Sequence, residues 1–162
     1  MRFCDALQHE DPVNAIFSSA LKVAFDANNA ATEHIDRLSP EARLVYLVCC
    51  LDGEIHNGGF CQFFFNSLGD HWAELLSHLD TIGAVISKGL LTEAIAIFPH
   101  SAPPRNREER IEQLDTLDDS KVDVLLSALD EHFWKYEDDL AHRLSEFVVR
   151  HPNATIAVSD GL

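Results

Sequence analysis

The stretch that decides the fold is Leu51-Asp-Gly-Glu-Ile-His-Asn-Gly-Gly-Phe-Cys-Gln-Phe-Phe-Phe-Asn-Ser-Leu-Gly69. Helical patterns lie on both sides of it. Asn57-Gly58-Gly59 in its middle therefore predicts the end of a helix, because Asn and Gly adopt the left-handed conformation that often ends helices. A β-hairpin at this point would need flanks that alternate with period two, and these flanks do not. After the break, Phe60, Phe63 and Phe64 fall on one face of a short second helix, so we interpret the stretch as an elbow between two helices.

Two amides lie on another face of that second helix. Gln62 and Asn66 are four residues apart, close enough to share a hydrogen bond. They could instead bind a ligand in a cleft, but no nucleophile or base accompanies them. Core architecture is therefore the preferred interpretation of the elbow.

Periodic apolar spacing runs through most of the chain, and no segment shows convincing strand alternation. Residues 43–51 are apolar nearly all round and predict a very hydrophobic central helix, which Ser39-Pro40-Glu41 would start. Between residues 122 and 148 the apolar positions step by three and four, which predicts one long helix or two with a bend near Glu137. Other helices are expected over residues 12–25, 30–38, 71–79 and 84–98. The sequence predicts an all-α fold, a single-domain compact bundle of about seven to eight helices over residues 1–150, with a loose tail over residues 151–162.

Polar residues mark three further helix starts. Asp70 is the expected N-cap of the helix over residues 71–79. Asn106 with Glu109 resembles a capping pair, and Ser120 with Asp123 fits an S-x-x-D capping box.

Acidic residues dominate the charge of the chain. Twenty-seven Asp and Glu against twelve Lys and Arg give a formal net charge of −15 and an isoelectric point near 4.8. Direct binding to nucleic acid is disfavoured, because it requires a basic surface that displaces counterions. The charge is compatible with a basic protein as partner.

Thirteen of the acids lie within residues 108–146, together with four bases. The helix dipole explains Glu108, Glu109 and Asp123, which fall in first turns. Others fall in mid-helix, where like charges repel. On a continuous helix, residues 130–139 would carry a net charge of −4 over a length of about 15 Å. The spacing between these charges would be similar to the spacing of phosphates along one DNA strand. The candidate partner-binding residues are Asp130, Glu131, Glu137, Asp138 and Asp139, followed by Asp115, Asp118 and Asp119.

Several functional classes lack their sequence signals. The cysteines have no C-x-x-C spacing. No apolar leader follows Met1, and the longest apolar run, residues 44–51, is too short to span a bilayer. A cytoplasmic protein is therefore expected. There is no glycine-rich phosphate loop and no G-x-S-x-G motif, and the histidine pairs lack the spacing of metal ligands. We expect neither enzyme activity nor a cofactor.

The elbow also carries a family resemblance. Its pattern is Glu54-x-x-Asn57-Gly58-Gly59-Phe60-x-Gln62-Phe63-Phe64-x-Asn66, followed by Ile82-Gly83-Ala84 and by Phe98-Pro99, Pro104 and Arg110. This pattern resembles the bacterial family of acidic DNA-mimic proteins over roughly residues 44–117. The resemblance implies an all-helical fold and a homodimer. It also implies that surface carboxylates occupy the DNA-binding face of a helix-turn-helix transcription factor and relieve repression.

The predicted function is therefore a DNA-mimic protein that blocks a basic DNA-binding protein. One alternative is an immunity or antitoxin-like inhibitor of a basic nuclease. Another is a small metal-dependent enzyme, with Asp52, Glu54 and His56 as ligands for zinc or iron. The alternative to a metal site is that these three residues have no functional role and are capping or solvated residues at the end of a helix.

Overall fold

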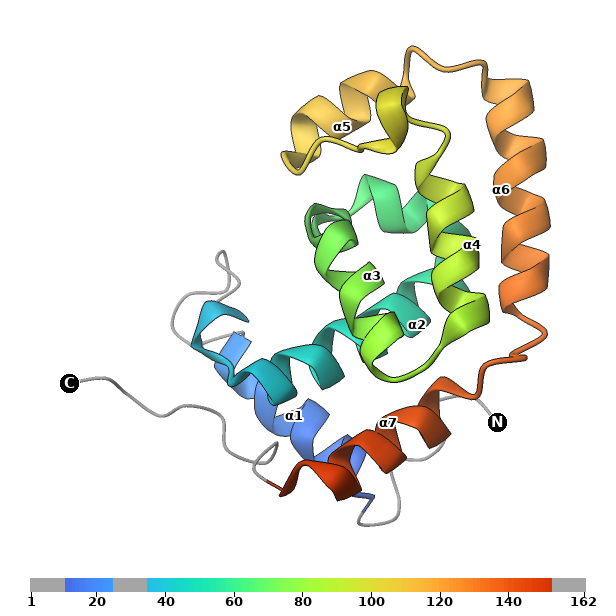
Figure 1. Ribbon diagram of the computed structural model, residues 1–162. Coiled ribbons are helices and arrows are strands. Elements are labelled where there is room, and N and C mark those ends of the chain that lie inside the picture. Colours follow the sequence, from blue (N-terminus) through green and yellow to red (C-terminus); the bar gives the residue numbers. More distant parts are fainter. Residues whose placement is uncertain (1–10, 25–34, 153–162) are drawn as a thin grey trace. The chain divides into compact units, whose positions relative to one another are not determined.

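The computed structural model describes residues 11–24 and 35–152 (Figure 1). These residues form seven α-helices joined by turns and short 3-10 segments, with no strand among them. The helices are α1 (Pro12–Ala24), α2 (Pro40–Phe65), α3 (Trp72–Thr81), α4 (Val85–Ile95), α5 (Arg107–Leu114), α6 (Asp119–Phe133) and α7 (Leu140–Arg150). The predicted all-α class is confirmed. Most of the helix expected over residues 30–38 and nearly all of the expected C-terminal tail lie outside the described residues.

The chain forms two compact units, one made of Met1–Cys49 and Ala141–Leu162, the other of Cys50–Leu140. In the first unit, the Phe17 ring of α1 stacks on Tyr46 of α2 at a centroid distance of 5.9 Å. The Ser39 hydroxyl accepts a hydrogen bond from the Ala42 amide, as the predicted helix start requires. Residues 44–49 of α2 are each at most 6% exposed, which their apolar sequence demands. The single-domain organisation stays a prediction.

In the second unit, α4 packs against both α3 and α6 (Figure 1). The buried side of α6 consists of Leu126, Leu129 and Phe133, at the spacing of one helical face. α4 ends at Ile95, earlier than the expected residue 98, because Pro99 disfavours helical backbone in the residue before it.

The apolar series between residues 122 and 148 forms two helices. This is the second of the two predicted arrangements, in which the chain bends near Glu137. α6 ends at Phe133 and α7 begins at Leu140. Tyr136 lies between them with φ of 56°, a conformation that no continuous helix allows. The acids of residues 130–139 therefore do not share one helix, and the regular spacing of about 15 Å inferred for them is wrong.

Two of the three predicted helix starts are also wrong. α3 begins at Trp72, after the 3-10 segment Ser67–His71. Asp70 does not cap α3 and instead pairs with Arg110. α6 begins at Asp119 with Asp118 as its N-cap, and the Ser120 hydroxyl donates to the Asp118 carboxylate at 2.7 Å. Asn106 does cap α5, because its side chain accepts from the Glu109 amide at 3.1 Å.

Candidate functional site

The elbow lies inside α2, where two glycines interrupt the helical path. Gly58 has φ −155° and ψ 20°, and Gly59 has φ 71° and ψ −172°. The backbone of Gly59 is open only to glycine, as the sequence predicted for this break. A Cβ atom on Gly59 would also lie 2.1 Å from an oxygen of Asp130, so this carboxylate packs directly on the glycine.

Asp130 of α6 holds the second half of α2 in place. Its Oδ1 accepts a hydrogen bond from the Phe60 amide at 2.8 Å. This amide is at the start of the helical segment that follows the kink, where a carboxylate is stabilised by unpaired N–H groups. Burial raises the pKa of Asp130, and the hydrogen bond from Phe60 lowers it. The half-exposed Asp130 carboxylate is thus bound to the protein's own backbone.

Glu54 connects the two halves of the elbow. The Asn66 side-chain amide donates to both Glu54 oxygens at 2.9 and 3.0 Å, and the Gln62 amide donates to one of them. The two amides therefore meet at a shared carboxylate instead of bonding to each other as predicted. Phe60, Phe63 and Phe64 are fully buried, as predicted from their spacing. These contacts support a structural role for the elbow.

Arg110 of α5 binds the backbone at the C-terminal end of α2. Its side chain is fully buried and donates to the carbonyls of Phe64 at 2.7 Å and Asn66 at 2.8 Å. The same guanidinium donates to the carbonyls of Pro104 and Arg105 and lies 2.7 Å from an Asp70 oxygen. A buried cation requires such partners for nearly every donor. Sequence reasoning missed this role, because one arginine between acids in a helical first turn looks solvated.

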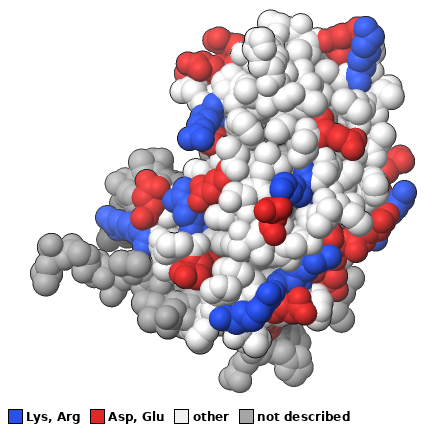
Figure 2. All heavy atoms as spheres, viewed as in Figure 1, with Lys and Arg blue, Asp and Glu red and all other residues white. Residues whose placement is uncertain are grey.

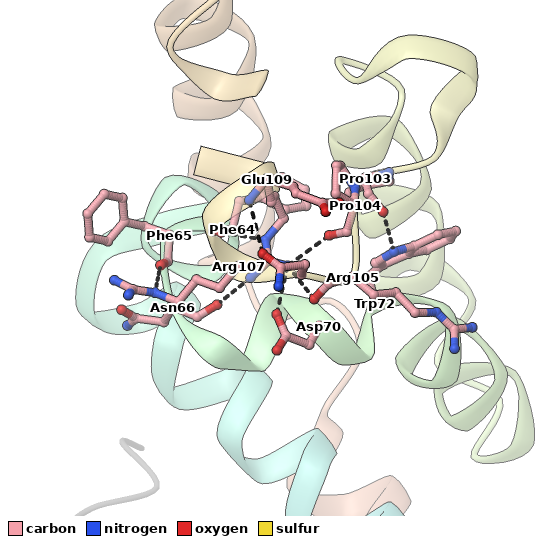
Figure 3. Close-up of polar contacts among 12 residues, drawn as sticks. Phe64, Phe65, Asn66, Asp70, Trp72, Pro103, Pro104, Arg105, Arg107 and Glu109 are labelled. Carbon is pink, nitrogen blue, oxygen red and sulfur yellow. Dashed lines mark hydrogen bonds and ion pairs between the residues drawn. The ribbon is translucent and has the colours of Figure 1, made fainter. Parts of the chain in front are cut away.

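The loop before α5 and the first residue of α5 make two further contacts, both drawn in Figure 3. The Trp72 indole donates to the Pro103 carbonyl at 3.0 Å. Arg107 donates to the Phe65 carbonyl at 2.7 Å, and its guanidinium lies 5.1 Å from the centre of the Phe65 ring. Together with Arg110, these contacts attach α5 to the end of α2 and the loop before α5 to the start of α3.

Asp138, another candidate partner-binding residue, is also engaged inside the protein. It is 4% exposed, and its Oδ2 accepts a hydrogen bond from the Ser87 amide at 2.8 Å. Ser87 lies in the first turn of α4, which begins at Val85. The carboxylate thus satisfies a free amide of that helix start. The Asp138 carboxylate is thus buried and bound to the start of α4, and its place among the candidate partner-binding residues stays a prediction.

The proposed metal ligands Asp52, Glu54 and His56 do not come together. His56 Nδ1 lies 3.3 Å from an Asp52 carboxylate oxygen and 2.8 Å from the Asp52 carbonyl, whereas Glu54 binds the elbow amides. Within residues 11–24 and 35–152, no group of three or more His, Cys, Asp and Glu is arranged to hold a metal. Burial raises the pKa of Asp52 to about 6, with His56 acting against the rise and Asp139 adding to it.

The remaining candidate acids divide by exposure. Glu137 and Asp118 are exposed and lie within 3.2 Å of His132 and 3.1 Å of Lys121, respectively. Nothing is described for the side chain of Asp119. Those whose side chains are exposed are Asp115, Asp118, Glu131, Glu137 and Asp139.

Most of the negative charge belongs to the second unit. Residues 50–140 contain 18 of the 27 acids and 6 of the 12 bases, which gives −12 of the net −15. On the face shown in Figure 2, acidic side chains are interspersed with basic ones. On α5, whose first residue Arg107 is an exposed base, the acids Glu108 and Glu112 and Asp115 at the C-cap are all exposed. These three, which we call the α5 row, fall at i, i+4 and i+7, on one helical face.

Comparison with known proteins places the chain in a family. Residues 36–151 match the DMP19-like proteins, a span that includes the elbow, Arg110 and the α5 row. The chain belongs to the family of DMP19-like proteins. This membership is compatible with a DNA-mimic protein, in agreement with the resemblance of the chain to the acidic DNA-mimic proteins. No curated protein and no solved structure matches the chain.

In this DMP19-like protein, the residues of the elbow pattern are therefore largely structural. Hydrogen bonds connect the segments that carry Glu54, Gln62, Asn66 and Arg110. The phenylalanines of the elbow fill the core. Across the described part of the chain, no helix is both long enough and apolar enough to traverse a lipid bilayer. The charges that face solvent are those of the exposed acids rather than those of the elbow.

Proposed function

We propose that this DMP19-like protein binds the DNA-contacting face of a basic DNA-binding protein, a helix-turn-helix transcription regulator, and blocks its access to DNA. Two observations support the proposal: membership of a DNA-mimic family and a net charge of −12 in residues 50–140. Long-range attraction between this charge and a basic surface would speed encounter and weaken with salt.

The α5 row is the surface that carries the proposal. Along a helix, Glu108 to Asp115 spans about 10 Å, which is about the distance from the first to the fourth phosphate of one DNA strand. The three exposed carboxylates thus carry a similar, slightly lower, charge per unit length. Arg110, a base within this segment, is fully buried, so its side chain does not interrupt the row at the surface.

Other exposed acids lie close to the row in sequence. Glu109 and Asp118 are both exposed and extend the acidic segment toward the start of α6. Glu131, Glu137 and Asp139 form a second exposed group, which remains from the face expected over residues 130–139. Asp130 and Asp138 are left out, because each binds a backbone amide.

The test is affinity capture from a lysate of the native host, with duplex DNA as competitor. The row variant Glu108→Gln, Glu112→Gln, Asp115→Asn is compared with a control of equal net charge, Glu41→Gln, Glu93→Gln, Glu146→Gln. We expect the wild type and the control to capture one basic DNA-binding protein, which duplex DNA displaces. The row variant should retain at least tenfold less of it, since several charge-assisted contacts are lost.

Each part of the proposal has an outcome that contradicts it. Capture that duplex DNA does not displace contradicts mimicry. Equal capture by the row variant and the control contradicts the assignment to α5. Capture of a nuclease instead of a transcription regulator contradicts the proposed target and supports the inhibitor alternative.

A further inference from the structure

Phe65 presents an aromatic ring to solvent at the end of α2, a feature that neither the elbow nor the α5 row explains. The other three phenylalanines of the elbow, Phe60, Phe63 and Phe64, are fully buried, whereas Phe65 is 50% exposed. In Figure 3 its ring lies at the outer edge of the contacts drawn. Cys61, one helical turn earlier, is also exposed. We call Phe65 and Cys61 the Phe65 patch.

Arg107 of α5 holds the exposed ring in a defined place. Its guanidinium lies 5.1 Å from the centre of the Phe65 ring, a cation–π contact, and donates a hydrogen bond to the Phe65 carbonyl at 2.7 Å. One side chain therefore binds both the ring and the backbone of Phe65. A ring that is ordered before binding loses little conformational entropy when a partner covers it.

Carboxylates of two helices lie close to the Phe65 patch. Burial raises the pKa of the Cys61 thiol, and the nearby carboxylate of Asp123 on α6 raises it further. Asp123 is exposed. On α5, Glu108 directly follows Arg107, which contacts the ring, and is the first member of the α5 row. The patch is therefore a small apolar centre with exposed acids of α5 and α6 near it.

We propose that the Phe65 patch anchors the same basic protein that the α5 row binds, by contacting an apolar side chain that Lys and Arg surround on that partner. The inference rests on the proposed function and adds a contact to its surface.

Charge complementarity selects this occupant. Residues 50–140 carry a net charge of −12, which attracts a basic surface, whereas a second copy of the chain would bring the same negative charge. Carboxylates alone attract any basic surface. An apolar contact requires a matching side chain on the partner, so the patch makes the binding selective.

The test is a double-mutant cycle between the full chain and two synthetic basic peptides. In one peptide, arginines flank a central leucine on both sides, and in the other a serine replaces the leucine. Dissociation constants are measured by fluorescence anisotropy at low ionic strength. We expect the wild type to bind the leucine peptide about tenfold more tightly than the serine peptide. Phe65→Ala should remove most of this preference, because the ring supplies the apolar contact.

Two controls accompany the cycle. Val85→Ala truncates an exposed apolar side chain of α4 and should keep the preference for leucine. Circular dichroism should show the same helical content in all variants, since half of the Phe65 side chain already faces solvent. Equal binding of the two peptides by the wild type overturns the inference, as does a preference for leucine that Phe65→Ala retains. A wild-type dimer that Phe65→Ala converts to a monomer shows that a second copy covers the ring, which also overturns it.

The row variant Glu108→Gln, Glu112→Gln, Asp115→Asn distinguishes this inference from the proposed function. It should weaken the binding of both peptides by the same factor and leave the preference for leucine unchanged, because it removes charge and keeps the ring. If the row variant binds both peptides as the wild type does while the preference remains, the assignment to the α5 row fails and the patch is supported. If neither peptide binds the wild type, the patch and the row both fail.

Discussion

Asp52 provides the sharpest test of the described packing. Its side chain is 4% exposed, and burial raises its pKa from 3.8 to about 6. The folded protein therefore binds the proton more tightly than the unfolded chain does. The contribution of Asp52 to the free energy of unfolding is fully present below pH 4 and is lost as the pH rises through about 6. A shift of about two pKa units corresponds to about 3 kcal/mol as an upper value.

The perturbation is Asp52→Asn, which keeps the shape of the side chain and cannot ionise. We expect the difference in unfolding free energy, variant minus wild type, to increase by about 2–3 kcal/mol between pH 4 and pH 8. The assay is urea unfolding followed by tryptophan fluorescence at several pH values in that interval. Glu93→Gln, an exposed carboxylate of α4, is the control, and its difference should stay within about 0.5 kcal/mol throughout.

The rise should run from about pH 4 to about pH 6 and level off above that, because between the two pKa values the folded protein holds a proton that the unfolded chain has released. A difference that is flat with pH would show that the Asp52 carboxylate is hydrated and not buried. A difference that falls with pH would show that ionised Asp52 is stabilised by His56 more than burial destabilises it. Either result refutes the reasoning.

Two further predictions concern the elbow and the neighbouring acids Asp138 and Asp139. Gly59→Ala should lower the free energy of unfolding by about 2–4 kcal/mol, because the positive φ and the contact with Asp130 exclude a Cβ atom. The control is Gly53→Ala, which should not destabilise the protein, because a Cβ atom there meets nothing within 4 Å. Equal losses of unfolding free energy for the two variants in denaturant titrations would contradict the prediction. Asp138→Ala should cost about 1–2 kcal/mol by freeing the Ser87 amide, whereas its exposed neighbour Asp139→Ala should cost less than about 0.5 kcal/mol. Thermal unfolding of the two variants side by side checks the second prediction, and a larger loss for Asp139→Ala would contradict it.

The features that sequence predicted correctly are local ones. Helix periodicity, the cap at Asn106 and the glycine break each depend on residues within a few positions of one another. The break at Gly58 and Gly59 needed no knowledge of the rest of the chain, because two adjacent glycines between helical patterns leave few alternatives.

The contacts that sequence did not predict join distant segments. Asp130 binds an amide 70 residues earlier, Asp138 one 51 residues earlier, and Arg110 a carbonyl 46 residues earlier. Each partner is a backbone group, which every residue possesses, so no sequence pattern marks it. An acid that caps a distant helix is therefore indistinguishable, in sequence, from an acid that faces solvent. The difference decides which acids can meet a partner.

The way in which Arg110 attaches α5 has a consequence for recognition. Arg110 is the buried residue of α5, and it holds the helix by directional hydrogen bonds to carbonyls rather than by apolar contact. Apolar surfaces can slide past each other, whereas a guanidinium with several fixed acceptors defines both the position and the rotation of its helix. The carboxylates on the opposite side of α5 are thereby preorganised, so a partner would lose little entropy in ordering the helix backbone when it binds.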